Sequence, residues 1–435
     1  MALLRPVSSS CASGTKPFLK SISPGCQTCV EGRWGCNYIN FLCSRNCFFC
    51  PQDRSIRDEQ VSQTEGFEFT TPEEHVEYLK TFDIKGVAFS GGEPLMAKDR
   101  LFSHLEAIRS EFGASIYIWM YTNGDLINND VLRRLRDVGL DEIRFDLSAR
   151  DYDLAPVILA REIMPTIAIE IPAIPEDLEQ VKDLLIKAQD LGVEFVNLHQ
   201  LNATQFNYRK LRERGYHFLH QEDIPVFESE ICALELLLFC QENCPELSVN
   251  YCNAIFKHRF QRHARRVRHG TLFLEDHEEL TPAAYLRSIS VADLPDHTTR
   301  LERKLRNLHQ YNQRISDSRL LIHGTSLDFV DSATASVLIS YSRPGLELTG
   351  STFVQDRLAA AHKPVLDTEG WHSTTIDAWR RLFIGGEDRT KVLKDWFQNY
   401  PDRILATMPR IAKEEDALHK IHELEVVDSG LPDVF

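Results

Sequence analysis

The feature that most constrains this 435-residue chain is a group of six cysteines between residues 26 and 50. The last three, Cys43, Cys47 and Cys50, have C-x3-C-x2-C spacing. Three thiolates on one short loop can hold three irons of a four-iron, four-sulfur cluster and leave the fourth iron without a protein ligand. A structural zinc site needs four protein ligands instead. The spacing therefore predicts an iron-sulfur cluster whose open iron binds a further ligand.

A second motif lies about forty residues downstream. Residues 85–89, Lys-Gly-Val-Ala-Phe, have the composition of a buried strand, and this stretch leads directly into Ser-Gly-Gly-Glu-Pro-Leu. The two glycines, Gly91 and Gly92, allow the backbone to approach a ligand closely, because they have no side chain. Glu93, followed by Pro94, is expected to accept hydrogen bonds from an ammonium group of that ligand.

Together, the cysteine loop and the Gly-Gly-Glu-Pro segment resemble the radical S-adenosylmethionine (radical SAM) superfamily. In that superfamily, the amino and carboxylate groups of SAM chelate the open iron. An electron from the cluster then splits the sulfonium and yields a 5′-deoxyadenosyl radical. The resemblance implies that Cys43, Cys47 and Cys50 are the catalytic cluster ligands, that Gly91 to Pro94 bind SAM, and that an external donor of the flavodoxin or ferredoxin type supplies the electron.

The alternation of short β-branched stretches with longer helical ones predicts a parallel sheet built from βα units. One helix should begin after Thr71, because Thr71, Pro72 and Glu74 fit a capping box with proline at the first helical position. The resemblance implies the superfamily's partial (β/α)6 barrel, a TIM-like α/β fold. The six predicted strands cover residues 36–41, 85–89, 116–121, 142–147, 166–171 and 194–199.

Polar residues follow several of these strands, and sites in β/α barrels collect at the carboxyl ends of the strands. By resemblance, Phe49 packs beside the adenine of SAM, while Thr122 and Asn123 lie within reach of its methionyl group. The remaining cofactor-binding candidates match positions on the fourth and sixth strands: Asp146, Ser148, Asn197 and His199. The alternative for Thr122 and Asn123 is an ordinary turn, and side chains on barrel strands can also face the helices.

Cysteines upstream of the loop predict a second metal site. Cys26 and Cys29 form a C-x2-C pair, Cys36 follows, and Cys252 at the end of a further predicted strand is the best candidate for a fourth ligand. Zinc and a second iron-sulfur cluster fit this set equally well. The other cysteines that we consider lie in a helical stretch and are expected to pack in the core: Cys232, Cys240 and Cys244.

Composition and charge limit the environment and the partners. Eleven cysteines, an odd number with metal-ligand spacing, favour a reducing, cytoplasmic location, and no apolar stretch is long enough to span a membrane. The net charge of −15 gives no general attraction to nucleic acid. The basic segment 257–268 is an exception that would suit an anionic substrate or RNA. Its alternative interpretation is a solvated helix face with Phe256, Phe260 and Val267 turned inward.

The predicted organisation is an N-terminal segment with extra cysteines (1–36), a radical SAM partial barrel (37–270) and a C-terminal α+β accessory domain (271–435). The chain is most similar to uncharacterised proteins related to pyruvate formate-lyase activating enzymes. Three function classes stay open at this point. They are hydrogen abstraction from a small molecule or an RNA-linked substrate, activation or modification of a protein or peptide, and non-catalytic binding of iron-sulfur or zinc.

Overall fold

The computed structural model describes residues 9–11, 14–52, 62–64, 67–219, 224–330 and 335–342. Two compact units divide the described chain, the first ending at Arg265 and the second beginning at Arg266. In the described residues, no helix has the length and apolar character needed to cross a membrane.

The first unit is built on an 11-stranded sheet whose central strands are all parallel. In spatial order these strands are β13 (Ser248–Cys252), β10 (Phe195–His199), β9 (Ile167–Pro172), β8 (Glu142–Phe145), β7 (Tyr117–Thr122), β6 (Gly86–Gly91) and β3 (Trp34–Asn40). Because the carboxyl ends of parallel strands lie at one edge of the sheet, residues far apart in sequence are brought together there.

Antiparallel strands extend the sheet at both edges. On one side β2 (Lys16–Leu19) pairs with β13 and β1 (Ser9–Cys11) pairs with β2. On the other side β4 (Ser62–Thr64) pairs with β3 and β5 (Phe67–Phe69) pairs with β4. Both N-terminal strands, β1 and β2, are therefore part of the sheet, and β2 lies beside its last parallel strand.

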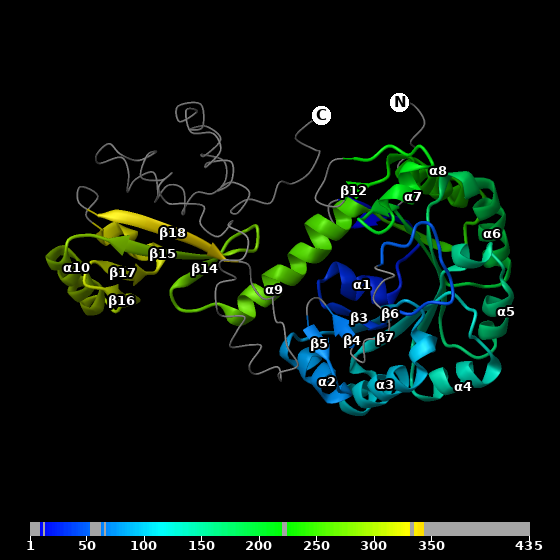
Figure 1. Cartoon of the computed structure of the whole chain (residues 1–435), viewed down its shortest axis with the longest axis horizontal. Coiled ribbons are helices and arrows are strands. Elements are labelled where there is room, and N and C mark those ends of the chain that lie inside the picture. The colour runs from blue at the N-terminus through cyan, green and yellow to red at the C-terminus, as the bar shows by residue number, and fades with distance from the viewer. Residues whose placement is uncertain are drawn as a thin grey trace. The chain divides into compact units, whose positions relative to one another are not determined.

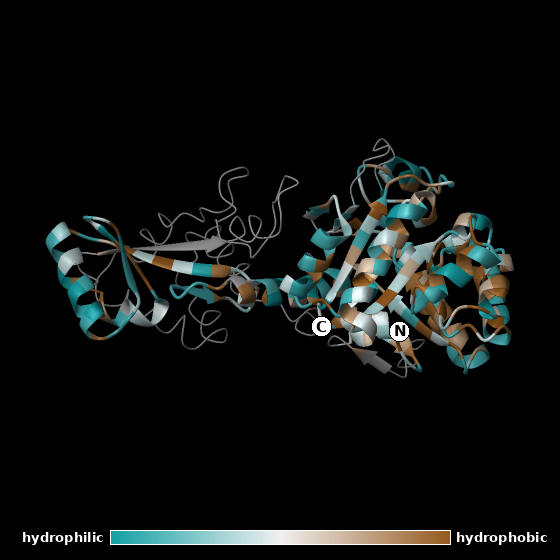
Figure 2. Cartoon of the chain, turned by 90° about the horizontal axis from the view of Figure 1, so that it is seen from below, coloured by the Kyte–Doolittle hydropathy of each residue, from teal (hydrophilic) through white to brown (hydrophobic). Residues whose placement is uncertain are grey.

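Helices cover the outside of the curved sheet (Figure 1). They are α2 (Pro72–Thr81), α3 (Lys98–Phe112), α4 (Asn129–Asp137), α5 (Ala155–Arg161), α6 (Leu178–Asp190) and α8 (Phe227–Asn243). The shorter helix α1 (Pro24–Val30) lies inside the curve of the sheet (Figure 1). The short strands β11 (Asn202–Ala203) and β12 (Ile224–Pro225) and the short helix α7 (Tyr208–Arg212) follow β10 in the sequence. The capping box of Thr71 and Glu74 begins α2 as predicted. The outer helices carry hydrophilic as well as hydrophobic positions (Figure 2), as expected of helices that pack one face on a sheet. The predicted partial-barrel α/β fold is confirmed.

Residues of α8 complete the core behind the sheet. Cys232 and Cys240 are buried in this helix, and Cys244 is buried just after its end. The prediction that these three cysteines pack in the core is confirmed.

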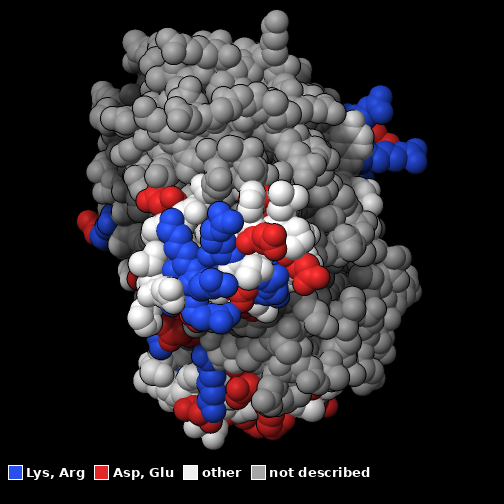
Figure 3. Space-filling model, turned by 90° about the vertical axis from the view of Figure 1, so that its left-hand side faces the viewer, with Lys and Arg blue, Asp and Glu red and all other residues white. Residues whose placement is uncertain are grey.

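The second unit is described as far as residue 342. It contains an antiparallel sheet of β14 (Glu278–Leu280), β15 (Leu286–Ala292), β16 (Asn312–Ser316), β17 (Arg319–Ile322) and β18 (Ser336–Ser342), with the helix α10 (Pro295–Asn307). Basic side chains gather on the face in Figure 3 with acidic ones among them, and Glu302 pairs with both Arg306 and Arg314. The composition of residues 335–341 favours a strand, and β18 covers nearly the same residues. The sequence also favours a strand at 421–427 and a helix at 376–400, and both lie outside the described residues.

Two histidines are buried beneath the β3–β4 edge of the sheet. The Nδ1 atoms of His75 and His104 are 3.1 Å apart, Asn37 Nδ2 is 3.0 Å from His75 Nδ1, and Ser62 Oγ is 3.4 Å from His104 Nε2. Burial lowers the pKa of His104 to about 4 and that of His75 well below its usual range. Both rings are therefore neutral in the folded protein at neutral pH.

We expect the free energy of unfolding to fall between pH 7 and pH 5. The unfolded chain takes up a proton on His104 near its usual pKa of 6.5, whereas the folded protein does not until about pH 4. The protonation of His104 in the unfolded chain should lower the free energy of unfolding by about 2 kcal/mol by pH 5. Urea unfolding at pH 7 and pH 5 measures this decrease. The decrease should be smaller in His104→Gln than in the wild type. Equal losses in the two proteins would contradict this assignment.

Candidate active site

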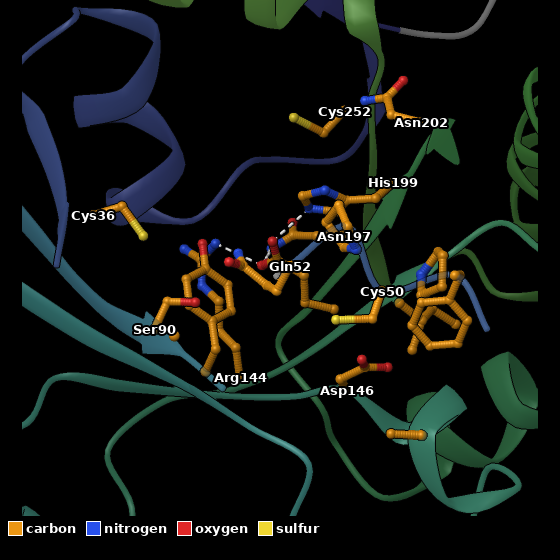
Figure 4. A pocket seen from close by; sticks show the side chains of 18 of the residues that line it. Cys36, Cys50, Gln52, Ser90, Arg144, Asp146, Asn197, His199, Asn202 and Cys252 are labelled. Atoms are coloured by element: carbon orange, nitrogen blue, oxygen red, sulfur yellow. Dashed lines mark hydrogen bonds and ion pairs between the residues drawn. The ribbon is translucent and has the colours of Figure 1, made fainter. Parts of the chain in front are cut away.

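A pocket of about 480 Å³ opens at the carboxyl ends of the parallel strands. Most of the predicted site residues line it: Cys43, Cys47, Cys50, Phe49, Gly91, Gly92, Thr122, Asn123, Asp146, Asn197 and His199, together with Cys26, Cys29, Cys36 and Cys252. The close view in Figure 4 shows side chains from several strands pointing into one space. The sheet therefore brings the two motifs and the strand-end residues together, as the sequence predicts.

The loop that carries Cys43, Cys47 and Cys50 follows β3 and is held by the segment after β7. The guanidinium of Arg45 donates two hydrogen bonds to Asp125, at 2.6 and 2.7 Å, and Ser44 Oγ donates to the same carboxylate at 2.7 Å. Asn123 Nδ2 donates to Ser44 Oγ at 2.9 Å and lies 3.7 Å from Cys43 Sγ. A bidentate ion pair has a defined geometry, so it fixes the loop's position over this strand end.

The far end of the same loop is held by residues that follow β10. Asn207 Nδ2 donates to the backbone oxygen of Phe49 at 2.9 Å, and Thr204 Oγ1 donates to that of Pro51 at 3.1 Å. Phe48 and Phe49 pack against a buried apolar cluster that includes Leu201, Leu211 and Val226. Phe49 thus lines the pocket while its backbone and ring are both held in place.

The glycine pair after β6 packs against the backbone that leads into the cysteine loop. Gly91 has φ +127°, and a Cβ on Gly92 would lie 1.8 Å from the carbonyl oxygen of Leu42. Gly92 N donates to Asn40 O at 2.9 Å and Glu93 N donates to Leu42 O at 2.6 Å. The glycines are needed for this contact between two backbone segments, in addition to any approach to a ligand.

Glu93 is predicted to meet a ligand ammonium, but in this structure its side chain faces the neighbouring strand and not the pocket. Glu93 is fully buried and does not line the pocket; its carboxylate accepts hydrogen bonds from Thr122 Oγ1 (2.9 and 3.1 Å), Asn123 N (2.8 Å) and Leu95 N (3.2 Å). Burial raises the pKa of Glu93 to about 7. Its partners lie on the next strand, so Glu93 joins the turn after β6 to the end of β7. Pro94 is also buried outside the pocket lining, at the start of a 3-10 helix (Pro94–Ala97).

At the end of β8, Asp146 lines the pocket but Ser148 does not. The Ser148 hydroxyl donates to the Asp146 carboxylate instead. Burial raises the pKa of Asp146 to about 6. Ser148 therefore orients Asp146, and only the carboxylate is placed to meet a ligand.

Two further charged residues of the pocket lie inside strands. The guanidinium of Arg144 on β8 is buried and donates to Glu142 at 2.7 Å, to Glu170 on β9 at 2.8 Å and to Ser23 Oγ at 2.9 Å. It also lies over the ring of Trp119, 4.9 Å from the centroid. Breaking such a buried pair would leave an uncompensated charge, at a cost of about 3–5 kcal/mol.

Glu170 connects Arg144 to side chains on β10 and to Lys257, which follows β13. Its carboxylate accepts from Asn197 Nδ2 at 2.8 Å and lies 2.5 Å from His199 Nε2, and Lys257 Nζ is 3.1 Å from His199 Nδ1. Burial alone would raise the pKa of Glu170, but His199 and Arg144 hold it well below its usual range. Burial and the Lys257 ammonium lower the pKa of His199. These partners fit a neutral His199 that donates through Nε2 to Glu170 and accepts from Lys257.

Arg144 and Glu170 were missed as site residues by sequence reasoning, whereas Lys257 was named only as part of the basic segment 257–268. The signal for the first two was a charge within an otherwise apolar strand, since an ionisable group is rarely buried without a partner. Lys257 begins the basic segment 257–268, and the interpretation of that segment as a solvated face is wrong at this position. Phe256 is buried as expected, whereas Phe260 and Val267 are half-buried.

The three loop cysteines fit an iron-sulfur cluster better than a single ion. They line one pocket, and none of the cysteines forms a disulfide in the described structure. Their C-x3-C-x2-C spacing supplies three thiolates, whereas a structural zinc site takes four protein ligands. A cluster of several irons spans a wider set of ligands.

Comparison with known proteins agrees with this geometry. Residues 38–201 match the model of the Radical SAM superfamily. The chain is 28% identical over 285 residues to the Methanocaldococcus jannaschii protein named "Putative glycyl-radical enzyme activating enzyme", covering 62% of this chain and 74% of the relative. It is also 25% identical over 181 residues to a "Probable GTP 3′,8-cyclase" of Saccharolobus islandicus, covering 38% of this chain and 55% of the relative.

Solved structures also match about half of the chain. SuiB of Streptococcus suis aligns with a TM-score of 0.37 and 15% identity, and coproporphyrinogen III oxidase (HemN) of Escherichia coli aligns with a TM-score of 0.33 and 16% identity. The alignments cover 51% and 52% of this chain, and 49% and 57% of the solved chains. The chain thus spans about half the length of these structures and of the Saccharolobus cyclase.

We expect Gly92→Ala to destabilise the protein by about 3 kcal/mol or more, because the new methyl group would overlap the Leu42 carbonyl and the backbone would have to move. Gly35→Ala is the matched control, since a Cβ there would meet its nearest atom, in Tyr78, at 3.7 Å. The control should change the free energy of unfolding by less than about 1 kcal/mol. Chemical unfolding measures both, and similar effects of the two substitutions would show that the close contact is unimportant.

Proposed function

We propose that this chain, a radical SAM enzyme, binds its four-iron cluster through Cys43, Cys47 and Cys50 and binds SAM against the strand ends of β6, β7 and β8. The observation that carries the proposal is that the three cysteines, the glycine turn and the strand-end polar residues line one pocket. When bound, the cluster supplies the electron that splits the SAM sulfonium into methionine and a 5′-deoxyadenosyl radical.

The residues of the chain have separate tasks in this proposal. The backbone of Gly91 and Gly92 borders the SAM amino group, Asn123 lies beside both the loop and the pocket, and Asp146 meets the ribose hydroxyls or the ammonium. Glu93 keeps the ends of β6 and β7 together and so positions Thr122 and Asn123, rather than contacting SAM. Phe49 packs against the adenine of SAM, and the apolar cluster of Leu201, Leu211 and Val226 supports its ring.

The substrate is proposed to lie toward β9, β10 and β13, where Glu170, His199 and Lys257 line the pocket. A small molecule with a carboxylate or phosphate, free or attached to RNA, would suit Lys257, because this lysine reaches the pocket and is hydrogen-bonded to a neutral histidine. The reaction class is hydrogen abstraction by the 5′-deoxyadenosyl radical.

A protein substrate is the second candidate. It is favoured by the alignment with the relative named for activating glycyl-radical enzymes, which covers 74% of that relative. In this case the pocket would receive one residue of an extended protein segment, and Lys257 would contact its backbone carbonyl groups. A flavodoxin or ferredoxin would donate the electron in either case.

The test is reductive SAM cleavage by anaerobically reconstituted protein. We expect 5′-deoxyadenosine and methionine to form in equal amounts on reduction, and replacement of Cys43, Cys47 and Cys50 by alanine to reduce the rate at least 100-fold, because the cluster loses its ligands. Cys240→Ala, in the core of α8, is the control and should retain the rate. Wild-type SAM cleavage by the triple variant would refute the proposal.

A further inference from the structure

Three strands at one edge of the sheet bring two cysteines and a lysine into register. Cys11 on β1 is paired with Lys16 on β2. β2 pairs with β13 so that Leu19 faces Val249 and Phe18 faces Asn250, and Lys16 and Cys252 each lie two residues beyond the second of these pairs. Directly opposed residues in neighbouring strands have their side chains on the same face of the sheet. Cys11, Lys16 and Cys252 therefore form a row across the edge.

The helix α1 adds two more cysteines to this row. Cys26, Cys29, Cys252 and Lys16 all line the pocket. The thiols of Cys11, Cys26, Cys29 and Cys252 are all close enough to interact electrostatically with the Lys16 ammonium. Cys29 Sγ accepts a hydrogen bond from Gln261 Nε2, and Cys26 Sγ lies 3.8 Å from Asn197 Oδ1.

The position of α1 is itself fixed by a close backbone contact. A Cβ on Gly32, which follows α1 and has φ +67°, would lie 2.6 Å from the backbone of Ala264 and Arg265. The segment that carries Gln261 is therefore packed directly against the turn after the C-x2-C helix.

The charge of Lys16 has no compensating carboxylate. Lys16 is 1% exposed, its Nζ lies 4.4 Å from the centroid of the Phe256 ring, and among the described residues its ammonium forms no hydrogen bond or ion pair. A buried ammonium without a negative partner is strongly unfavourable. Four neutral thiols would not offset this charge, whereas thiolates that bind a metal would, because four thiolates around a divalent ion carry a net negative charge.

Cys36 lies apart from this group. Its surroundings are Ser90, Glu170 and Arg144, and Figure 4 shows it well separated from Cys252. The sequence-based set of Cys26, Cys29, Cys36 and Cys252 is therefore not brought together, because Cys36 points from β3 into the middle of the barrel while Cys252 lies at the end of β13.

We propose that Cys11, Cys26, Cys29 and Cys252 bind a second thiolate-ligated metal centre, zinc or an iron-sulfur cluster, whose negative charge is partly offset by Lys16. Binding would release the thiol protons and draw the four sulfurs together around the metal. The site is independent of the loop cysteines and of the proposed reaction, so it can be present even if SAM is not cleaved.

The test starts from the variant with Cys43, Cys47 and Cys50 replaced by alanine, which removes the first cluster. Purified anaerobically, this protein should retain about one metal centre per chain. Adding Cys11→Ser should reduce its metal content at least fivefold, and Cys252→Ser should do the same. The matched control Cys36→Ser should leave it unchanged. Zinc without sulfide indicates a zinc site, while iron with an equal amount of sulfide and visible absorption indicates a cluster.

Two results would overturn the proposal. One is a starting variant that contains no metal although its circular dichroism and melting temperature are those of a folded protein. The other is loss of metal on Cys36→Ser with full retention on Cys11→Ser and Cys252→Ser. Because all readouts are metal contents of folded protein, failure here would be distinguishable from failure of SAM cleavage.

Discussion

The contact between two backbone segments, the glycine turn after β6 and the start of the cysteine loop after β3, is the constraint on which the rest of the site depends. Asn40 O and Leu42 O each accept a hydrogen bond from this turn, and no side chain fits at Gly92. Glu93 then ties the same turn to Thr122 and Asn123. Three consecutive strand ends are thereby joined, so the cysteine loop cannot shift without moving the residues proposed to bind SAM.

A second, charged network holds the opposite side of the pocket. Arg144 is paired with Glu142 and Glu170, and Glu170 in turn holds Asn197 and His199. Each side chain of this network supplies hydrogen-bond partners for the others, which is the condition for charged groups to remain buried. This network forms a polar wall of the pocket, and in the proposed function Lys257, which contacts His199, is the residue that would bind an anionic substrate.

The strands, the helix start at Thr71 and the two motifs could be predicted from the sequence, because they depend on local composition and spacing. The orientation of Glu93 could not, since its hydrogen-bond donors Thr122 and Asn123 come from a different strand. The same limit explains Cys36. Sequence proximity grouped it with Cys26 and Cys29, whereas the proposed second site takes Cys11, which the pairing of β1 with β2 places opposite Lys16.

The most direct measurement of the central claim is electron paramagnetic resonance of the reduced protein with and without SAM. If Cys43, Cys47 and Cys50 hold a four-iron cluster with an open iron in this pocket, adding SAM should change the spectrum of the reduced cluster, because a new ligand binds the iron. The change should persist in Cys36→Ser. A reduced-cluster spectrum that is the same with and without saturating SAM would contradict the account.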